Sequence, residues 1–196
     1  MVSIRKILQI LFYIQNKSDN QARFNIMYLL KIIYFADRYH LRHFGFLFTG
    51  DEYYAMRKGP VASAVKDVLY QKIPFGANSS EYDLLSCVDD ISEFERKITK
   101  QEQDELSESF IESLDFAIFE FGKMTPDEIS DFSHNYPDWK KHEKEVINGG
   151  RSKMLLLDFF DNPKNLKKSE DPFQQQDTES LEAIKEDFAD NENSCR

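Results

Sequence analysis

The apolar positions of this 196-residue chain recur mainly at helical spacing. Near its start they follow the i, i+3, i+4, i+7 pattern of one helix face, and Ser3 suits the N-cap of that helix. Residues 24–44 are instead apolar on nearly every side, which is typical of a helix that is buried all round. Lys31 interrupts this run and Asp37 ends it, short of the about 20 predominantly apolar residues that a membrane span needs. The pattern therefore predicts a soluble domain around a buried central helix.

An aromatic segment follows the central helix. Residues 49–58 begin with a turn-like Thr-Gly-Asp sequence and continue with aromatic residues, which favours a short strand. Gly59 suits a helix N-cap, and Pro60 suits the first helical position, where its missing N–H costs nothing. We therefore expect the next helix to cover residues 60–71.

The second half of the chain combines two candidate strands with further helices. Residues 84–88 and 94–98 would pair with the first strand in a small antiparallel sheet. Helices must cover one face of that sheet, because a lone hairpin is only marginally stable in water. Thr99 opens a capping box and a helix that ends near Gly122, and Thr125 opens a second capping box. The predicted fold class is mainly α (α+β), a compact helical domain over residues 1–160.

The composition changes at residue 161. Residues 161–196 contain ten acids and five bases, half of the net charge of −10, and few apolar residues, which predicts a disordered acidic tail. Within it, Leu181, Ile184 and Phe188 share one face of a short amphipathic helix behind Thr178. Such a helix can bind in a partner's groove. The alternative is a frayed terminal helix without a partner.

Charge and cysteine content narrow the class of protein. A net charge of −10 argues against nucleic acid as a partner, because binding to phosphates needs clustered Lys and Arg. It suits either a basic protein partner or simple solubility. Cys87 and Cys195 cannot form a disulfide framework, and the first residues lack a signal-peptide pattern. We therefore expect a cytoplasmic protein that neither spans nor binds a membrane.

The histidines provide the only enzyme-like material. His40 and His43 can share one helix face, and Asp37 lies three residues before His40. A metal site needs three or four ligands, so neither a metal nor a cofactor is expected. A buried carboxylate needs a partner, and we expect Asp37 to pair with Arg57 or Lys58 as a structural bridge. The alternative is an enzyme with an unfamiliar site near Asp37, His40, His43 and Arg57.

Candidate binding residues lie on the predicted strand. Successive strand residues face opposite sides, so one of Tyr53 and Tyr54 should enter the core while the other is exposed beside Arg57 or Lys58. Exposed Tyr and Arg are typical of an interface centre, although ordinary cross-strand packing explains them equally well. Trp139 is a further candidate, either as an interface anchor or as a residue packed on the core.

Several short motifs follow one another in order along the chain: residues 31–37 (KIIYFAD), His40, Leu41, Gly45, residues 49–56 (TGDEYYAM) and residues 59–61 (GPV). Together they resemble the Panacea domain of the SocA-like antitoxin family. The resemblance covers roughly residues 3–160. Within the motifs we assign a structural role to Lys31, Tyr34, Asp37, Gly50, Gly59 and Pro60.

The resemblance implies a function as well as a fold. A protein similar to this family is expected to be an antitoxin that neutralises a cognate toxin by direct protein–protein binding, without catalysis. Two alternatives remain open at this point, a regulatory adaptor that binds a host or phage factor and, less favoured, the enzyme described above. The toxin, its mode of neutralisation and the oligomeric state are not predicted.

Overall fold

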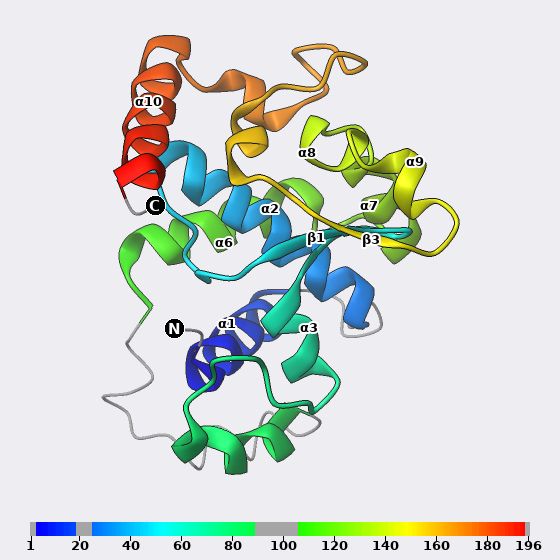
Figure 1. Cartoon of the computed structure of the whole chain (residues 1–196), viewed down its shortest axis with the longest axis vertical. Helices are drawn as coiled ribbons and strands as arrows, with labels where there is room; N and C mark the ends of the chain where they lie inside the picture. The colour runs from blue at the N-terminus through cyan, green and yellow to red at the C-terminus, as the bar shows by residue number, and fades with distance from the viewer. Residues whose placement is uncertain (1–2, 19–24, 89–105, 195–196) are drawn as a thin grey trace.

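Helix α2 (Ile26–Phe44) forms the centre of the molecule, and the other elements pack around it (Figure 1). The computed structural model describes residues 3–18, 25–88 and 106–194. The helix begins after Asn25, whose side-chain oxygen accepts a hydrogen bond from the Tyr28 N–H, and it ends at Gly45, which has a left-handed φ of +79°. Every residue from 28 to 38 is buried, which confirms the predicted central helix.

The remaining helices surround α2. In the described residues they are α1 (Ile4–Lys17), α3 (Ser63–Leu69), the 3-10 helix η2 (Ser79–Val88), α6 (Glu108–Phe121), α7 (Pro126–Ser133), α8 (Pro137–Lys140), α9 (Glu143–Val146), the 3-10 helices η3 (Leu156–Phe160) and η4 (Pro172–Gln175), and α10 (Thr178–Ser194). Figure 1 shows α1, α3 and η2 below the strands and α10 above them. The N-cap at Ser3 and the capping box at Thr125 are confirmed.

A small antiparallel sheet packs against α2. Its strands are β1 (Tyr53–Met56), β2 (Gly59–Ala62) and β3 (Arg151–Lys153), in the order β2-β1-β3. The short strand expected within residues 49–58 is therefore confirmed, and the fold is mainly helical with a small antiparallel sheet, as the sequence predicts.

The helix expected from Pro60 is wrong at its start, because Gly59 and Pro60 belong to β2 and pair with Met56 and Ala55 of β1. Helix α3 begins only at Ser63. The carboxylate of Asp51, and not Gly59, accepts hydrogen bonds from the backbone N–H groups in its first turn.

The predicted strand at residues 84–88 is wrong. Residues 84–88 belong to the 3-10 helix η2, in which the side chains of Leu84 and Leu85 are buried. Residues 94–98 and the predicted helix start at Thr99 lie outside the described residues. Helix α6 begins at Glu108, where the Ser107 side chain caps it, so the helix is not continuous through residue 107. The third strand is β3, whose three polar residues show no apolar alternation.

The acidic segment after residue 160 contains η4 and α10. Phe173 of η4 is only 2% exposed, and its ring packs among those of Phe35, Phe121 and Tyr136. Helix α10 contacts α2 and η3. In this conformation the segment therefore packs against α2 and the core. Its disorder in solution and the domain boundary at residue 160 stay predictions. None of the helices in the described ranges has the length and apolar character of a membrane span.

Candidate functional site

The polar residues of α2 point into the protein and hold the β1–β2 hairpin. Lys31 is 1% exposed, and its Nζ donates a hydrogen bond of 2.6 Å to the Pro60 carbonyl of β2. Burial lowers the pKa of this ammonium to about 7. The approach requires glycine at position 59, where φ is +101° and a Cβ would lie 2.8 Å from Lys31 Cε and 2.5 Å from Ser133 Oγ.

Asp37 attaches the other strand to α2. Its carboxylate accepts hydrogen bonds from the Thr49 N–H at 3.1 Å, from the Thr49 hydroxyl, and from the Tyr53 hydroxyl at 2.8 Å. Burial raises the pKa of Asp37 to about 7, although these donors oppose the shift. The expected bridge from Asp37 to Arg57 or Lys58 is wrong, because Thr49 and Tyr53 already satisfy the carboxylate while both basic residues are exposed near the hairpin turn.

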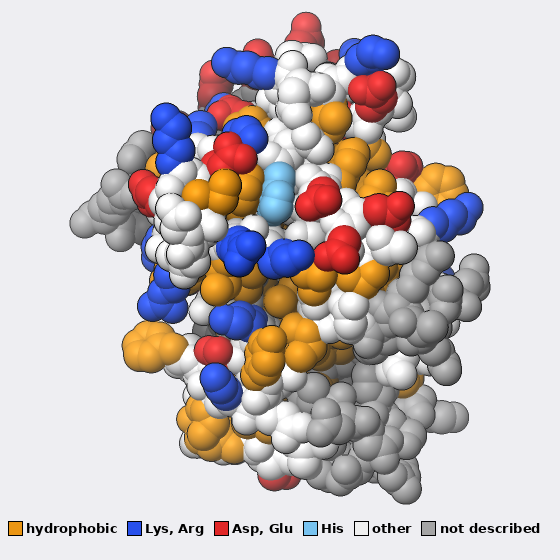
Figure 2. Space-filling view, turned by 90° about the vertical axis from the view of Figure 1, so that its right-hand side faces the viewer, with side chains coloured by type: hydrophobic (Ala, Val, Ile, Leu, Met, Phe, Trp, Pro, Cys, Tyr) orange, Lys and Arg blue, Asp and Glu red, His pale blue; other side chains and the backbone are white. Residues whose placement is uncertain are grey.

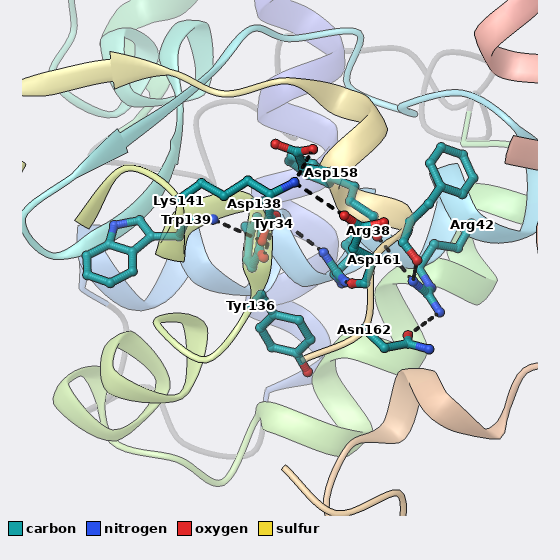
Figure 3. Close-up of polar contacts among 12 residues, drawn as sticks. Tyr34, Arg38, Arg42, Tyr136, Asp138, Trp139, Lys141, Asp158, Asp161 and Asn162 are labelled. Carbon is teal, nitrogen blue, oxygen red and sulfur yellow. Dashed lines mark hydrogen bonds and ion pairs between the residues drawn. The ribbon is translucent and has the colours of Figure 1, made fainter. Parts of the chain in front are cut away.

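A buried ion pair connects α2 to α8 (Figure 3). Arg38 Nη1 lies 3.3 Å from Asp138 Oδ2, and neither side chain is exposed. The same carboxylate accepts hydrogen bonds from the Tyr34 hydroxyl at 2.8 Å and from the Trp139 N–H at 3.1 Å. Burial raises the pKa of Asp138, and the adjacent Arg38 guanidinium opposes that shift. Four polar groups on two helices are thus fixed in one buried cluster.

The guanidinium groups of α2 also hold the chain that follows β3. Arg38 Nη2 donates to the Asp161 carbonyl at 2.5 Å. Arg42 donates to the carbonyls of Phe159 (3.2 Å), Phe160 (2.6 Å) and Phe173 (3.3 Å) and to the side chain of Asn162 (2.9 Å). Residues 159–173 are therefore attached to α2 mainly through their backbone, and Figure 3 shows the one side-chain contact, from Arg42 to Asn162.

These contacts give the predicted motif residues a structural role in the fold. Lys31, Tyr34 and Asp37 are interior hydrogen-bonding groups, and Gly59 and Pro60 lie at the contact between β2 and α2. Gly50 differs, because a Cβ there would meet nothing within 4 Å, so only its φ of +66° requires glycine. Sequence reasoning missed Asp138, which is the partner of Tyr34, and the role of Arg42. The available signal was the i, i+4 pair of Arg38 and Arg42 in the helix that the apolar run predicts to be buried.

The hairpin presents an aromatic and basic surface, hereafter the hairpin surface (Tyr54, Arg57, Lys58 and Arg151). Tyr53 is 1% exposed, as predicted for the tyrosine that enters the core, whereas Tyr54 is half-buried rather than exposed. The Arg151 guanidinium lies 5.2 Å from the centroid of the Tyr54 ring. Figure 2 shows Lys and Arg side chains grouped across the middle of the face at this end of the molecule, beside a group of acidic ones.

The family model described as "Antitoxin SocA-like, Panacea domain" matches residues 29–140. The match covers more than half of the chain and includes α2, the hairpin, α6 and α7. The chain belongs to the SocA-like antitoxin family. Comparisons with curated proteins and with solved structures gave no match.

Trp139 lies inside this Panacea domain. Trp139 is 3% exposed. Its Nε1–H donates a hydrogen bond to the Met56 carbonyl at 2.8 Å, and its ring stacks on that of His134. Trp139 is therefore packed on the core in this conformation, and its role as an interface anchor stays a prediction. Through its hydrogen bond to Met56, Trp139 holds the end of β1, next to the hairpin surface.

The histidines of the Panacea domain make structural contacts. The His40 ring nitrogens lie 2.7 Å from the Phe46 carbonyl and 3.2 Å from the Ser109 hydroxyl, and His43 Nδ1 lies 2.9 Å from the Tyr39 carbonyl. Asp37, His40 and Arg57 share no hydrogen bond or ion pair, so the structure does not join them into one site. Across the described ranges, no three His, Cys, Asp or Glu residues are grouped so that they could hold a metal ion.

The apolar face of α10 contacts the Panacea domain itself. Leu181 is buried, Ile184 Cγ2 lies near Gly45, and the Phe188 ring is 5.7 Å from that of Phe160. One ion pair, between Lys185 and Asp161 at 2.9 Å, accompanies this packing. The three residues predicted to bind a partner therefore have an intramolecular contact in this conformation.

Proposed function

We propose that this protein is the antitoxin of a toxin–antitoxin system and neutralises a cognate protein toxin, encoded beside it, by direct binding in the cytoplasm. The observation that carries the proposal is the family match over residues 29–140, since the family supports a toxin–antitoxin role in general. The proposed action is binding without catalysis, and the separate hydrogen-bond partners of Asp37 and His40 support it.

The hairpin surface is the first candidate for toxin contact. Its aromatic and basic residues are typical of the centre of an interface. Lys31 and Asp37 fix both strands beneath it, so the surface is preorganised and loses little freedom on binding. Leu181, Ile184 and Phe188 form the second candidate, and they become available to a toxin only when α10 leaves α2.

Co-expression tests the proposal. The neighbouring gene is induced alone and then together with this protein, and complexes are recovered on this protein. Growth arrest by the neighbour that this protein relieves, with a stable complex, is the expected result. A harmless neighbour would overturn the proposal and favour an adaptor for another partner.

Two charge reversals test the surface. Arg57→Glu changes the hairpin surface at an exposed residue, and Lys168→Glu makes the same charge change at an exposed position outside it. Only Arg57→Glu is expected to weaken neutralisation and complex recovery. Equal behaviour of the two variants would remove the hairpin surface from the proposal while leaving the antitoxin function intact.

A further inference from the structure

A second surface of the Panacea domain lies between the end of α6 and α7. It is a groove with a volume of about 650 Å³, hereafter the acidic groove. Its lining includes two apolar side chains, Met124 and Phe132, hereafter called its floor, and three acidic ones, Glu120, Glu128 and Asp131, hereafter called its rim.

The floor of the acidic groove is held by the core. The Phe132 ring lies 5.6 Å from that of Phe121, 6.1 Å from that of Phe35 and 6.0 Å from that of Tyr136, measured between centroids. These contacts fix the half-buried Phe132 in place. The groove therefore offers apolar surface that a ligand can cover without first ordering the protein.

The rim is strongly acidic. Three carboxylates and one ammonium, that of Lys123, line the groove. Glu128 is partly used in the fold, since one of its oxygens accepts a hydrogen bond from the Thr125 N–H at 2.7 Å. The carboxylates of Glu120 and Asp131 make no hydrogen bond or ion pair among the described residues. These two negative charges are available to a ligand, and they belong to a chain whose net charge is −10.

We propose that the acidic groove binds a basic amphipathic helix of the protein partner. Apolar side chains of that helix would cover Met124 and Phe132, and Lys or Arg side chains flanking them would pair with Glu120 and Asp131. Complementary charge selects this occupant, because an acidic segment or a nucleic acid would be repelled by the same rim. Identification of the partner as the toxin rests on the proposed function, whereas the preference of the groove for a basic helix does not.

A synthetic probe tests the groove independently of any toxin. The probe is a fluorescein-labelled amphipathic helix of Leu and Lys, about 18 residues or five turns long. A version with Glu in place of Lys is the charge control. Binding is followed by fluorescence anisotropy with the full-length protein at low and at moderate salt, since rim charges act mainly through salt-dependent attraction.

Two variants with the same change in net charge separate the groove from the rest of the surface. Glu120→Lys/Asp131→Lys alters the groove, and Glu182→Lys/Glu186→Lys alters the exposed face of α10. Figure 1 shows α10 and α7 on opposite sides of the molecule. Unchanged circular dichroism melts establish that both variants fold. Met124→Gln, which makes the floor polar, is the third variant.

We expect the Leu/Lys probe to bind the wild type, and the groove variant to bind it about tenfold more weakly than the α10 variant does. Met124→Gln should weaken binding as well, because the floor contributes apolar contact. Equal loss in the two charge variants would overturn the inference, since net charge alone would explain the binding. Wild-type affinity in the groove variant would also overturn it.

The toxin complex provides the second readout. If co-expression yields a complex, the groove variant should lose it while the α10 charge variant retains it. A complex that the groove variant retains would refute the groove as the contact and leave the antitoxin function standing. Absence of any complex would instead count against the proposed function, and the probe would still decide what the groove binds.

Discussion

Two ion pairs of equal length allow the effect of burial to be measured within one protein. Arg38–Asp138 and Lys58–Asp127 both have N···O distances of 3.3 Å. The first pair is fully buried, whereas the side chains of the second are 65% and 78% exposed. We compare Arg38→Met with Lys58→Met, because each variant removes one cation and keeps an unbranched apolar stem.

The expected magnitudes differ by several kcal/mol. Arg38→Met leaves the Asp138 carboxylate buried without its cation, and it also removes the donor to the Asp161 carbonyl. Breaking a buried pair in this way costs about 3–5 kcal/mol. Lys58→Met should cost about 0–1 kcal/mol, because solvent already screens the pair. At roughly 2–4 °C per kcal/mol for a chain of this length, Arg38→Met should lower the Tm by about 6–20 °C.

Urea unfolding measures the difference directly. Circular dichroism follows the helices, and the fluorescence of Trp139, the only tryptophan, follows the residue next to Asp138. Comparable m values would show that the free energies of unfolding can be compared. A cost for Arg38→Met within about 1 kcal/mol of that for Lys58→Met would refute the reasoning. Asp138→Asn, which preserves the shape of the side chain, tests the same pair from the other side, because it leaves the Arg38 guanidinium buried without its anion.

Three further predictions concern the hairpin, a buried acid and the C-terminal segment. Gly59→Ala should lower the Tm more than Gly50→Ala, because only the new Cβ at 59 meets other atoms, and equal shifts in thermal melts would contradict a steric role. The folded state keeps a proton on Asp37 up to about pH 7, whereas the unfolded chain releases it near pH 4. Wild-type stability should therefore fall relative to Asp37→Asn between these values, by at most about 1.4 kcal/mol per pH unit, and urea titrations that show a constant difference would argue against it. A chain ending at residue 161 should melt well below one ending at residue 177, because only the shorter one loses the buried Phe173, and coincident melts would support a segment that is disordered from residue 161.

The central helix and several caps could be predicted because their signals are local. The apolar run of α2, the N-cap at Ser3 and the capping box at Thr125 all depend on residues within a few positions of one another. The division of Tyr53 and Tyr54 followed from strand alternation alone. These features require no knowledge of what lies across the fold.

The features that sequence reasoning missed depend on long-range contacts. Gly59-Pro60 fits a helix start as well as a strand, and the contact with Lys31, 29 residues from Pro60, makes it a strand. The partner of Asp37 was assigned to a base because a buried acid needs compensation, but hydroxyl groups provide it here. Strand β3 is too short and polar to show a period. Most hydrogen bonds of Arg38 and Arg42 end on backbone carbonyl oxygens, which every residue type provides.

Because most of these bonds end on backbone oxygens, the attachment of residues 159–173 to the two arginines depends little on the side chains of the segment. Four of the five oxygen atoms that the two α2 arginines bind in residues 159–173 belong to the backbone. The arginines lie inside the span shared with the family, and the segment they hold lies after it. The arginines thus fix the backbone path of this segment, whereas its buried Phe159, Phe160 and Phe173 side chains fit the core. Its exposed positions, such as Lys167 and Lys168, can therefore change the outer surface of the protein without loss of the arginine contacts.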